Sequence, residues 1–334
     1  MKNVGTFFNK VLGLNAASRD SQEVTLLAHP KGLLLEMGDD IRYQYFQQSS
    51  NILSKNIKIT FGHIYGLKGY QGFDMDEANE TISIKADNVV SAPYSLCELR
   101  NDQFGVLAIT TIEAFADMLT GCSCFAKKGH HLYNQNTFLV SDVQKLSLYS
   151  NTDVSMMRNV CEAKTTAFKV VGIDNKLISG IKKWLNYANN PKNGTGDTLY
   201  VLLGNGQMKL QAQNCAVIFP VSALPVYAGI INKVNTMLDY KFLVHEEILD
   251  WESLLTAIKS KDDFIEMDGN EILRTYSSDF ISYAYLKEYE AFRLNTKSNA
   301  LFFTSDDGVV QSTVLFMLRN PEKIKTKQEN EEDE

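Results

Sequence analysis

The strongest constraint on the fold of this chain is one order of segments that occurs three times. In each third, a segment with the apolar spacing of a helix precedes several runs that alternate like β-strands, and a second helical segment precedes further strands. The expected helices are at residues 6–17, 63–70, 110–119, 175–188, 246–259 and 281–294. This order predicts an α+β protein of three repeated domains, each with two helices packed on antiparallel sheets.

Turn residues separate the predicted strands in the manner of hairpins. Gly-Asn-Gly at 204–206 and Asp-Asp-Gly at 306–308 each lie between two apolar strand segments. Residues of these types tolerate the positive φ that tight reversals need. Neighbouring strands should therefore run antiparallel.

Two segments divide the chain, and a third ends it. Residues 99–105 are polar and contain turn residues, and residues 220–227 place two prolines in an otherwise apolar run. The final segment holds three lysines and six acidic residues with hardly any apolar side chain, so it should be disordered. We therefore expect domains at 1–104, 105–225 and 226–320, followed by a charged tail at 321–334.

Composition restricts the class of protein. The 334 residues include 33 Lys+Arg and 40 Asp+Glu, for a net charge of −7, and 18 Phe and 15 Tyr make the chain too aromatic to stay unfolded. Five scattered cysteines, an odd number, indicate a reducing cytoplasm. We expect no signal peptide and no membrane span, because the longest uncharged run, 215–232, contains two prolines and is shorter than ~20 apolar residues.

Candidate catalytic and metal-binding residues do not form a convincing set. Cys122 and Cys124, with His130 and His131, are spaced more tightly than zinc ligands usually are, and no second pair completes the site. The glycines at 204–206 lack the Gly-Lys-Ser/Thr ending of a phosphate loop, and three Asp-Asp pairs lie in turns. We expect no enzyme activity, no catalytic residue, no cofactor and no metal.

Basic residues recur on or beside the helical segments although the chain as a whole is acidic. Each lysine taken singly is explained by a solvated helix face, or by the preference of lysine for helix C-termini. Their repetition instead favours one shared basic surface, with the acidic residues elsewhere. The candidates are Lys10, Lys68, Lys127, Lys128, Lys176, Lys182, Lys183, Lys259, Lys261, Lys287 and Arg293.

Several motifs together resemble one protein family. The runs that carry the resemblance are residues 112–119, 136–140, 146–157, 169–185, 198–210 and 217–221, the segment Leu-Pro-Val-Tyr-Ala-Gly-Ile-Ile at 224–231, and the closing hairpin at 301–319. Their order is similar to that of the bacterial DNA polymerase III β sliding clamps. In those proteins a Phe-Pro-x-Tyr linker leads into the third domain, and residues 224–231 resemble it.

The chain also departs from that family. Its third domain is short, and the closing segment reads Phe-Met-Leu-Arg at 316–319 instead of Met-Pro-Met-Arg. Val-Ser-Met at 154–156 stands where Gly-His-Arg usually follows Thr-Asp, and the first domain matches only in layout. Such divergence suits a virus-encoded clamp, for example that of a bacteriophage.

The resemblance implies a processivity factor for DNA replication. Two chains would join head to tail as a homodimeric ring, with the helices around double-stranded DNA held without sequence preference. A clamp loader would open the ring, and a DNA polymerase would be tethered to it in the cytoplasm of a bacterium or an infected host cell. The alternative is a viral structural or host-interaction protein that shares the architecture without encircling DNA, and a nucleotide hydrolase is a weaker third.

The resemblance also implies a hydrophobic pocket that holds short peptides of the polymerase and other partners. Apolar residues at strand ends more often belong to the core, which is the competing interpretation. By motif position the pocket would involve Thr152, Met157, Pro225, Ile230, Val314, Phe316, Met317 and Leu318.

Overall fold

Two compact units make up the chain in the computed structural model. The structure describes residues 2–49, 51–98, 102–126, 131–152, 155–239, 264–267, 270–273, 292–295 and 300–317. Unit 1 comprises Met1–Ala116 and Leu177–Ser222, and unit 2 comprises Asp117–Lys176 and Ala223–Glu334. Each unit thus combines parts of two predicted thirds, and the three-domain division remains a prediction.

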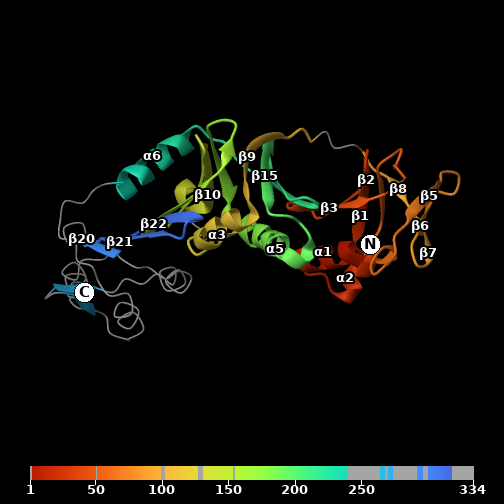
Figure 1. Ribbon diagram of the computed structural model, residues 1–334, viewed down its shortest axis with the longest axis horizontal. Coiled ribbons are helices and arrows are strands. Elements are labelled where there is room, and N and C mark those ends of the chain that lie inside the picture. Colours follow the sequence, from red (N-terminus) through yellow and green to blue (C-terminus); the bar gives the residue numbers. More distant parts are fainter. Residues whose placement is uncertain are drawn as a thin grey trace, which may run out of the picture. The chain divides into compact units, whose positions relative to one another are not determined.

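Unit 1 is built on one long antiparallel sheet with strand order β9-β15-β16-β17-β3-β2-β1-β4-β8 (Figure 1). The strands are β1 (Glu23–His29), β2 (Gly32–Met37), β3 (Arg42–Gln48), β4 (Ile57–Thr60), β8 (Ser95–Leu96), β9 (Gly105–Thr111), β15 (Thr198–Gly204), β16 (Gln207–Gln211) and β17 (Cys215–Pro220). A separate sheet contains β5 (Gly72–Asp76), β6 (Thr81–Lys85) and β7 (Val89–Pro93). Because β17 pairs with β3, one sheet continues across the boundary expected at residue 104.

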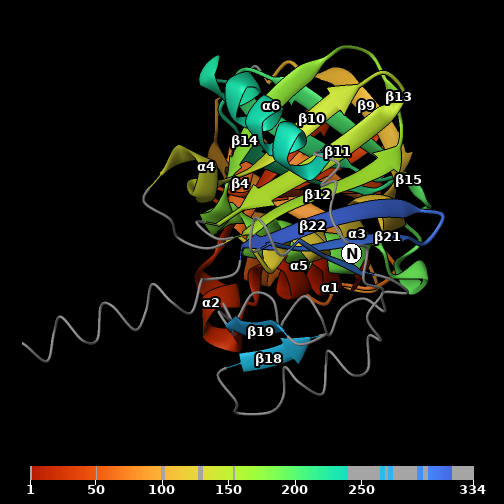
Figure 2. The same ribbon diagram turned by 90° about the vertical axis from the view of Figure 1, so that its left-hand side faces the viewer.

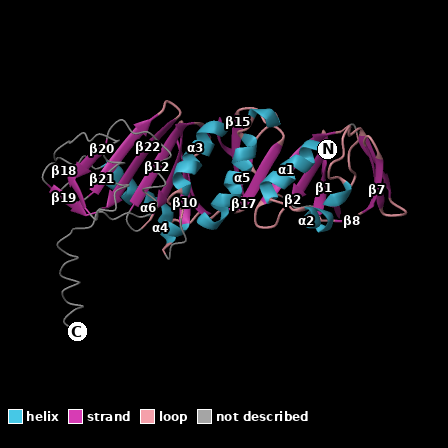
Figure 3. Ribbon diagram, turned by 90° about the horizontal axis from the view of Figure 1, so that it is seen from below, coloured by secondary structure: helices cyan, strands magenta, loops and turns pink. Residues whose placement is uncertain are grey.

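Two helices cover one face of the unit 1 sheet. They are α1 (Lys2–Leu12) and α5 (Ile178–Ala188), which lie side by side (Figure 3). In α1, apolar residues at positions 4, 7, 8 and 11 form a buried stripe of helical period. Phe7 contacts Tyr187 of α5 and Tyr45 of β3, with ring centres 4.9 and 5.3 Å away. Aromatic packing therefore holds both helices against the sheet.

The remaining helical elements of unit 1 are short. They are α2 (Ala16–Ser21), η1 (Phe61–His63) and η3 (Pro191–Asn193). The helix predicted at 6–17 is divided because Gly13 has a φ of 67° and Asn15 caps α2 through the backbone N–H of Ser18. The helix predicted at 63–70 is absent from these described residues, since Gly66 and Gly69 have φ values of 80° and 60°.

Unit 2 contains a sheet with strand order β14-β10-β11-β12-β22-β21-β20 (Figure 2). Its strands are β10 (Asn136–Asp142), β11 (Lys145–Asn151), β12 (Ser155–Glu162), β14 (Lys169–Asp174), β20 (Phe292–Asn295), β21 (Ala300–Asp306) and β22 (Val310–Met317). Other elements are β13 (Lys164–Thr165), η2 (Asn175–Leu177), α4 (Leu132–Gln135) and a hairpin of β18 (Phe264–Met267) and β19 (Asn270–Leu273). Every pairing within the main sheet is antiparallel, as predicted.

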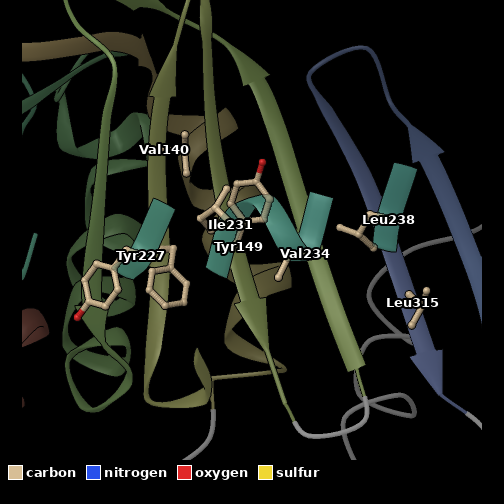
Figure 4. Close-up of a cluster of buried hydrophobic side chains, with 8 residues drawn as sticks. Val140, Tyr149, Tyr227, Ile231, Val234, Leu238 and Leu315 are labelled. Carbon is tan, nitrogen blue, oxygen red and sulfur yellow. The ribbon is translucent and has the colours of Figure 1, made fainter. Parts of the chain in front are cut away.

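Helices cover both faces of the unit 2 sheet. The C-terminal part of α3 (Ile112–Ser123) lies on one face, where Asn159 of β12 donates from Nδ2 to the carbonyl of Met118, 2.8 Å away. On the opposite face lies α6 (Val226–Asp239), whose residues Tyr227, Ile231, Val234 and Leu238 are buried (Figure 4). Successive strand residues point to opposite faces, so the two helices use alternate side chains of the same strands.

The structure differs from the sequence prediction in the last third. A helix occupies residues 226–239, although residues 224–231 resemble a linker in the sequence, and the expected helix at 246–259 lies outside the described residues. Residues 292–295 form β20, so the helix expected at 281–294 does not extend to its predicted end. The tail at 321–334 also lies outside the described residues. Within the described part, no helix is both long and apolar enough to cross a bilayer.

Candidate nucleic-acid interface and peptide pocket

Helices α1 and α5 of unit 1 carry lysines and no carboxylates. Lys10, in the last turn of α1, and Lys183 of α5 are exposed, and Lys182 of α5 is half-buried. Neither helix contains Asp or Glu. The Lys10 amine lies 5.8 Å from the ring centre of Tyr187, so it stands against the neighbouring helix. This face can attract phosphate groups without competition from acidic side chains of its own helices.

Two further candidate lysines occupy different positions from those expected. Lys68 is exposed in the loop after η1, outside any helix, and its carbonyl accepts a hydrogen bond from the Asp87 N–H at 2.9 Å. Lys176 is exposed in η2 of unit 2, and its amine lies 3.8 Å from an Asp174 oxygen. The prediction of a helical position for Lys68 is therefore wrong, because the glycines on either side of it end the helical geometry.

The basic pattern is weaker in unit 2. Helix α3 contains no basic residue and carries Glu113 and Asp117. Arg293 lies in strand β20, opposite Phe302, and not on a helix as predicted. The other candidates lie outside the described residues: Lys127, Lys128, Lys259, Lys261 and Lys287. The described lysines that share a helix face are thus those of α1 and α5.

The predicted pocket residues lie on different faces of the unit 2 sheet. Met157 and Val314 face each other across β12 and β22 and are fully buried. Met157 lies on the α3 side, where a Cβ on Gly121 would meet its side chain, whereas Ile230 belongs to α6 on the other side. Met157 and Val314 are accordingly core residues, and the sheet separates them from Ile230.

The other pocket candidates lie near the ends of elements. Thr152 forms a tight turn in which its hydroxyl oxygen is 2.5 Å from that of Ser155. Pro225 is exposed and directly precedes α6. Phe316 and Met317 belong to the end of β22, and Leu318 lies outside the described residues.

Hydrogen bonds and an ion pair link α6 to the sheet in a polar cluster that the sequence did not predict. Asn235 accepts through Oδ1 from the hydroxyl of Tyr149 at 3.0 Å and from a guanidinium nitrogen of Arg158 at 3.1 Å. Arg158 also forms an ion pair with Asp239 at 2.8 Å. The partners are separated by about eighty residues, so no local pattern could have brought them together.

Burial is the main cause of the shifted pKa values in the core. Burial raises the pKa of Tyr43 to about 12 and that of Cys215 to about 12. Cys122 is fully buried, where burial and then Cys124 raise its pKa, and Asn159 donates toward its sulfur. Within the part of the chain that the structure describes, no three His, Cys, Asp or Glu side chains gather as metal ligands.

Comparison with known proteins places the fold. No protein-family model and no curated protein matches the sequence. Three solved structures superpose on 95% of this chain: the beta subunit from DNA polymerase of Streptococcus pyogenes (TM-score 0.64, 10% identity, 97% of that chain), the DNA polymerase sliding clamp from Bacillus subtilis (0.65, 10%, 97%) and the DNA polymerase III subunit beta from Pseudomonas aeruginosa (0.65, 11%, 98%). The fold predicted from the motif order is confirmed: this chain has the fold of the DNA polymerase sliding clamps.

Proposed function

We propose that this protein is a sliding clamp, a processivity factor that encircles double-stranded DNA and tethers a DNA polymerase during replication. The likeness in fold over nearly the whole chain carries this proposal. The carboxylate-free face of α1 and α5 supports it, because a surface that slides on DNA needs positive charge without base-specific contacts. The protein would act without enzymatic activity.

The proposed contacts with DNA are loose and electrostatic. Lys10, Lys182 and Lys183 would each neutralise phosphates in turn as the duplex moves. Retention would come from closure of a ring, which we propose to be a head-to-tail homodimer opened by a clamp loader. A bacteriophage origin and a cytoplasmic site in the bacterium or infected cell belong to the same proposal.

The proposed partner pocket lies in unit 2 and would use residues of the turn at Thr152, of α6 with the residue before it, and of β22. Pro225 is exposed and could contact a peptide directly. Thr152, Phe316, Met317 and Leu318 complete the proposed set of contacts. Met157 and Val314 would support such a pocket from within the core, because they have no exposed surface. Ile230 would contribute from α6.

A topological experiment tests the ring. The protein is diluted until its subunits separate and then concentrated with nicked circular DNA, so that no loader is required. At physiological salt we expect it to elute with the circles in gel filtration and to dissociate after one restriction cut. Equal dissociation from circular and linear DNA would contradict encirclement and favour the structural alternative.

A second experiment tests the basic face. The double variant Lys10→Gln, Lys183→Gln is expected to bind linear DNA with a shallower salt dependence, the slope of log K against log salt falling by about 0.9 for each phosphate that the protein no longer neutralises. The matched control is Lys55→Gln, Lys85→Gln, which removes two exposed lysines paired with Glu77 and Asp74 away from these helices. An unchanged slope in the first variant would exclude this face as the surface that binds DNA.

A further inference from the structure

The face of the unit 1 sheet opposite α1 and α5 is polar. Leu33, Leu35, Tyr43 and Tyr45 point toward the helices and are buried, so the residues between them point the other way. Glu36 of β2 pairs in register with Gln44 of β3, and Arg42 with Ile218 of β17. A solvated sheet face would expose such side chains, but Glu36, Arg42 and Gln44 are only 7%, 3% and 5% exposed.

Arg42 forms ion pairs with two carboxylates on this face, those of Glu36 and Asp102. Its guanidinium lies 3.3 Å from Glu36 and 2.8 Å from Asp102, and it donates to the side-chain oxygen of Gln207 at 2.8 Å. The Gln44 amide donates to Glu36 at 2.7 Å. These contacts hold the carboxylates of Glu36 and Asp102 at Arg42.

A cavity of about 300 Å³ opens beside this cluster and is basic. Three of its lining side chains are His29, Lys31 and Lys209. Its other polar lining residues carry amides, namely Gln44, Gln211, Gln213 and Asn214. Among the described residues, no carboxylate lines this cavity.

The pKa values of His29 and Lys209 are both lowered, and burial is the largest cause of each shift. Burial, and then Lys31 and Lys209, lower the pKa of His29. Burial also lowers the pKa of Lys209, opposed by Glu36 and Asp102 and reinforced by Arg42. An anion placed among the three basic groups would relieve this repulsion.

The cavity also offers amide side chains that a ligand can reach. Gln211 is half-buried and Gln213 is exposed, and both line the cavity. Amide oxygens accept hydrogen bonds from hydroxyl or N–H donors, so these two residues suit a hydroxylated ligand. Phe46 adds an aromatic wall, with its ring centre 4.9 Å from that of His29.

We propose that this cavity binds a phosphate monoester of a small hydroxylated compound. The phosphate lies among His29, Lys31 and Lys209, and the hydroxyl groups donate to the side-chain oxygens of Gln211 and Gln213. A dianionic phosphate matches three basic side chains better than a single carboxylate does. The volume is at the lower limit of pockets that hold small organic ligands, so the ligand has about the size of a pentose phosphate.

Calorimetric titration of the full chain tests this site with ribose 5-phosphate as the probe. We expect saturable binding that is weaker for inorganic phosphate and absent for ribose. Lys209→Gln should weaken it at least tenfold and Lys31→Gln several-fold, whereas the control Lys55→Gln should leave it unchanged. Lys31 is exposed, so its variant remains informative should Lys209→Gln fail to fold.

Three results would overturn the site. They are the absence of saturable binding, equal weakening by Lys55→Gln, and binding that persists unchanged in Lys31→Gln. Preferential binding of citrate over ribose 5-phosphate would refute the assignment to phosphate. The outcome is independent of the DNA-retention experiment, since neither Lys10 nor Lys183 lines the cavity.

Discussion

The two main sheets differ in what covers the second of their two faces. In unit 2, α3 packs on one face and α6 on the other, and the contact with α6 is made by buried aromatic and aliphatic side chains. In unit 1, helices pack on one face only of the described sheet, and the other carries an ionic cluster with two cavities of about 490 and 300 Å³. Burial of a sheet face therefore does not require an apolar partner, provided that each charge is hydrogen-bonded.

The largest expected effect is the difference in unfolding free energy lost when one aromatic ring is truncated beneath α6 in unit 2 and one on the polar sheet face of unit 1. Tyr227→Ala removes a fully buried ring beneath α6 and is expected to lower the free energy of unfolding by about 3–5 kcal/mol. Phe46→Ala, at a half-buried ring beside a cavity, should cost about 1–2 kcal/mol because less area leaves water on folding. Urea denaturation measures both. Equal decreases would mean that the two faces are equally well packed.

Removal of the arginine from each polar cluster should give the next largest contrast. Arg42→Met leaves Glu36 buried without its cation and is expected to cost about 3 kcal/mol. Arg158→Met should lower the free energy of unfolding by about 1 kcal/mol, since the Asp239 side chain that loses its ion-pair partner is 59% exposed and remains solvated. The same denaturation experiment applies. A larger decrease for Arg158 would show that attachment of α6, and not charge burial, dominates.

The smallest expected effect concerns pH. Because burial, Lys31 and Lys209 lower the pKa of His29, the unfolded chain takes up this proton at higher pH than the folded chain. The contribution of His29 to stability is therefore lost as pH falls below 6.5. In His29→Gln, thermal unfolding midpoints at about pH 7.5 and about pH 5.5 should lie closer together than in the parent. If the difference between the two midpoints is the same in His29→Gln as in the parent, His29 does not cause the pH dependence.

Local patterns in the sequence predicted much of the fold. The apolar stripe of α5 and the turn chemistry at 204–206 and 306–308 appear where expected, with Asn205, Gly206 and Gly308 at positive φ. Helix α6 was missed because Pro220, Pro225 and Gly229 suggest a linker, although residues 227, 231, 234 and 238 have helical spacing. Tertiary packing on an apolar sheet face outweighs those local preferences.

The candidate surfaces were less predictable than the elements that carry them. Lys10 and Lys183 belong to one helix pair only because α1 and α5 pack side by side, and no local sequence pattern predicts contact between segments so far apart. The ionic cluster at Arg42 was likewise not predictable, because Arg42 meets Asp102 only in the folded chain. Asp102 and Phe104 line one cavity with Arg42 and Gln44, although they are far from them in the sequence.

The pairing of β17 with β3 has a mechanical consequence. Four residue pairs from Cys215–Tyr45 to Ile218–Arg42 join the strands, and Phe46 adds a backbone hydrogen bond to Asn214 at 2.8 Å. Separating β17 from β3 would break these hydrogen bonds at the same time and expose the aromatic core beneath them. The pairing therefore makes the sheet resist bending between these two strands.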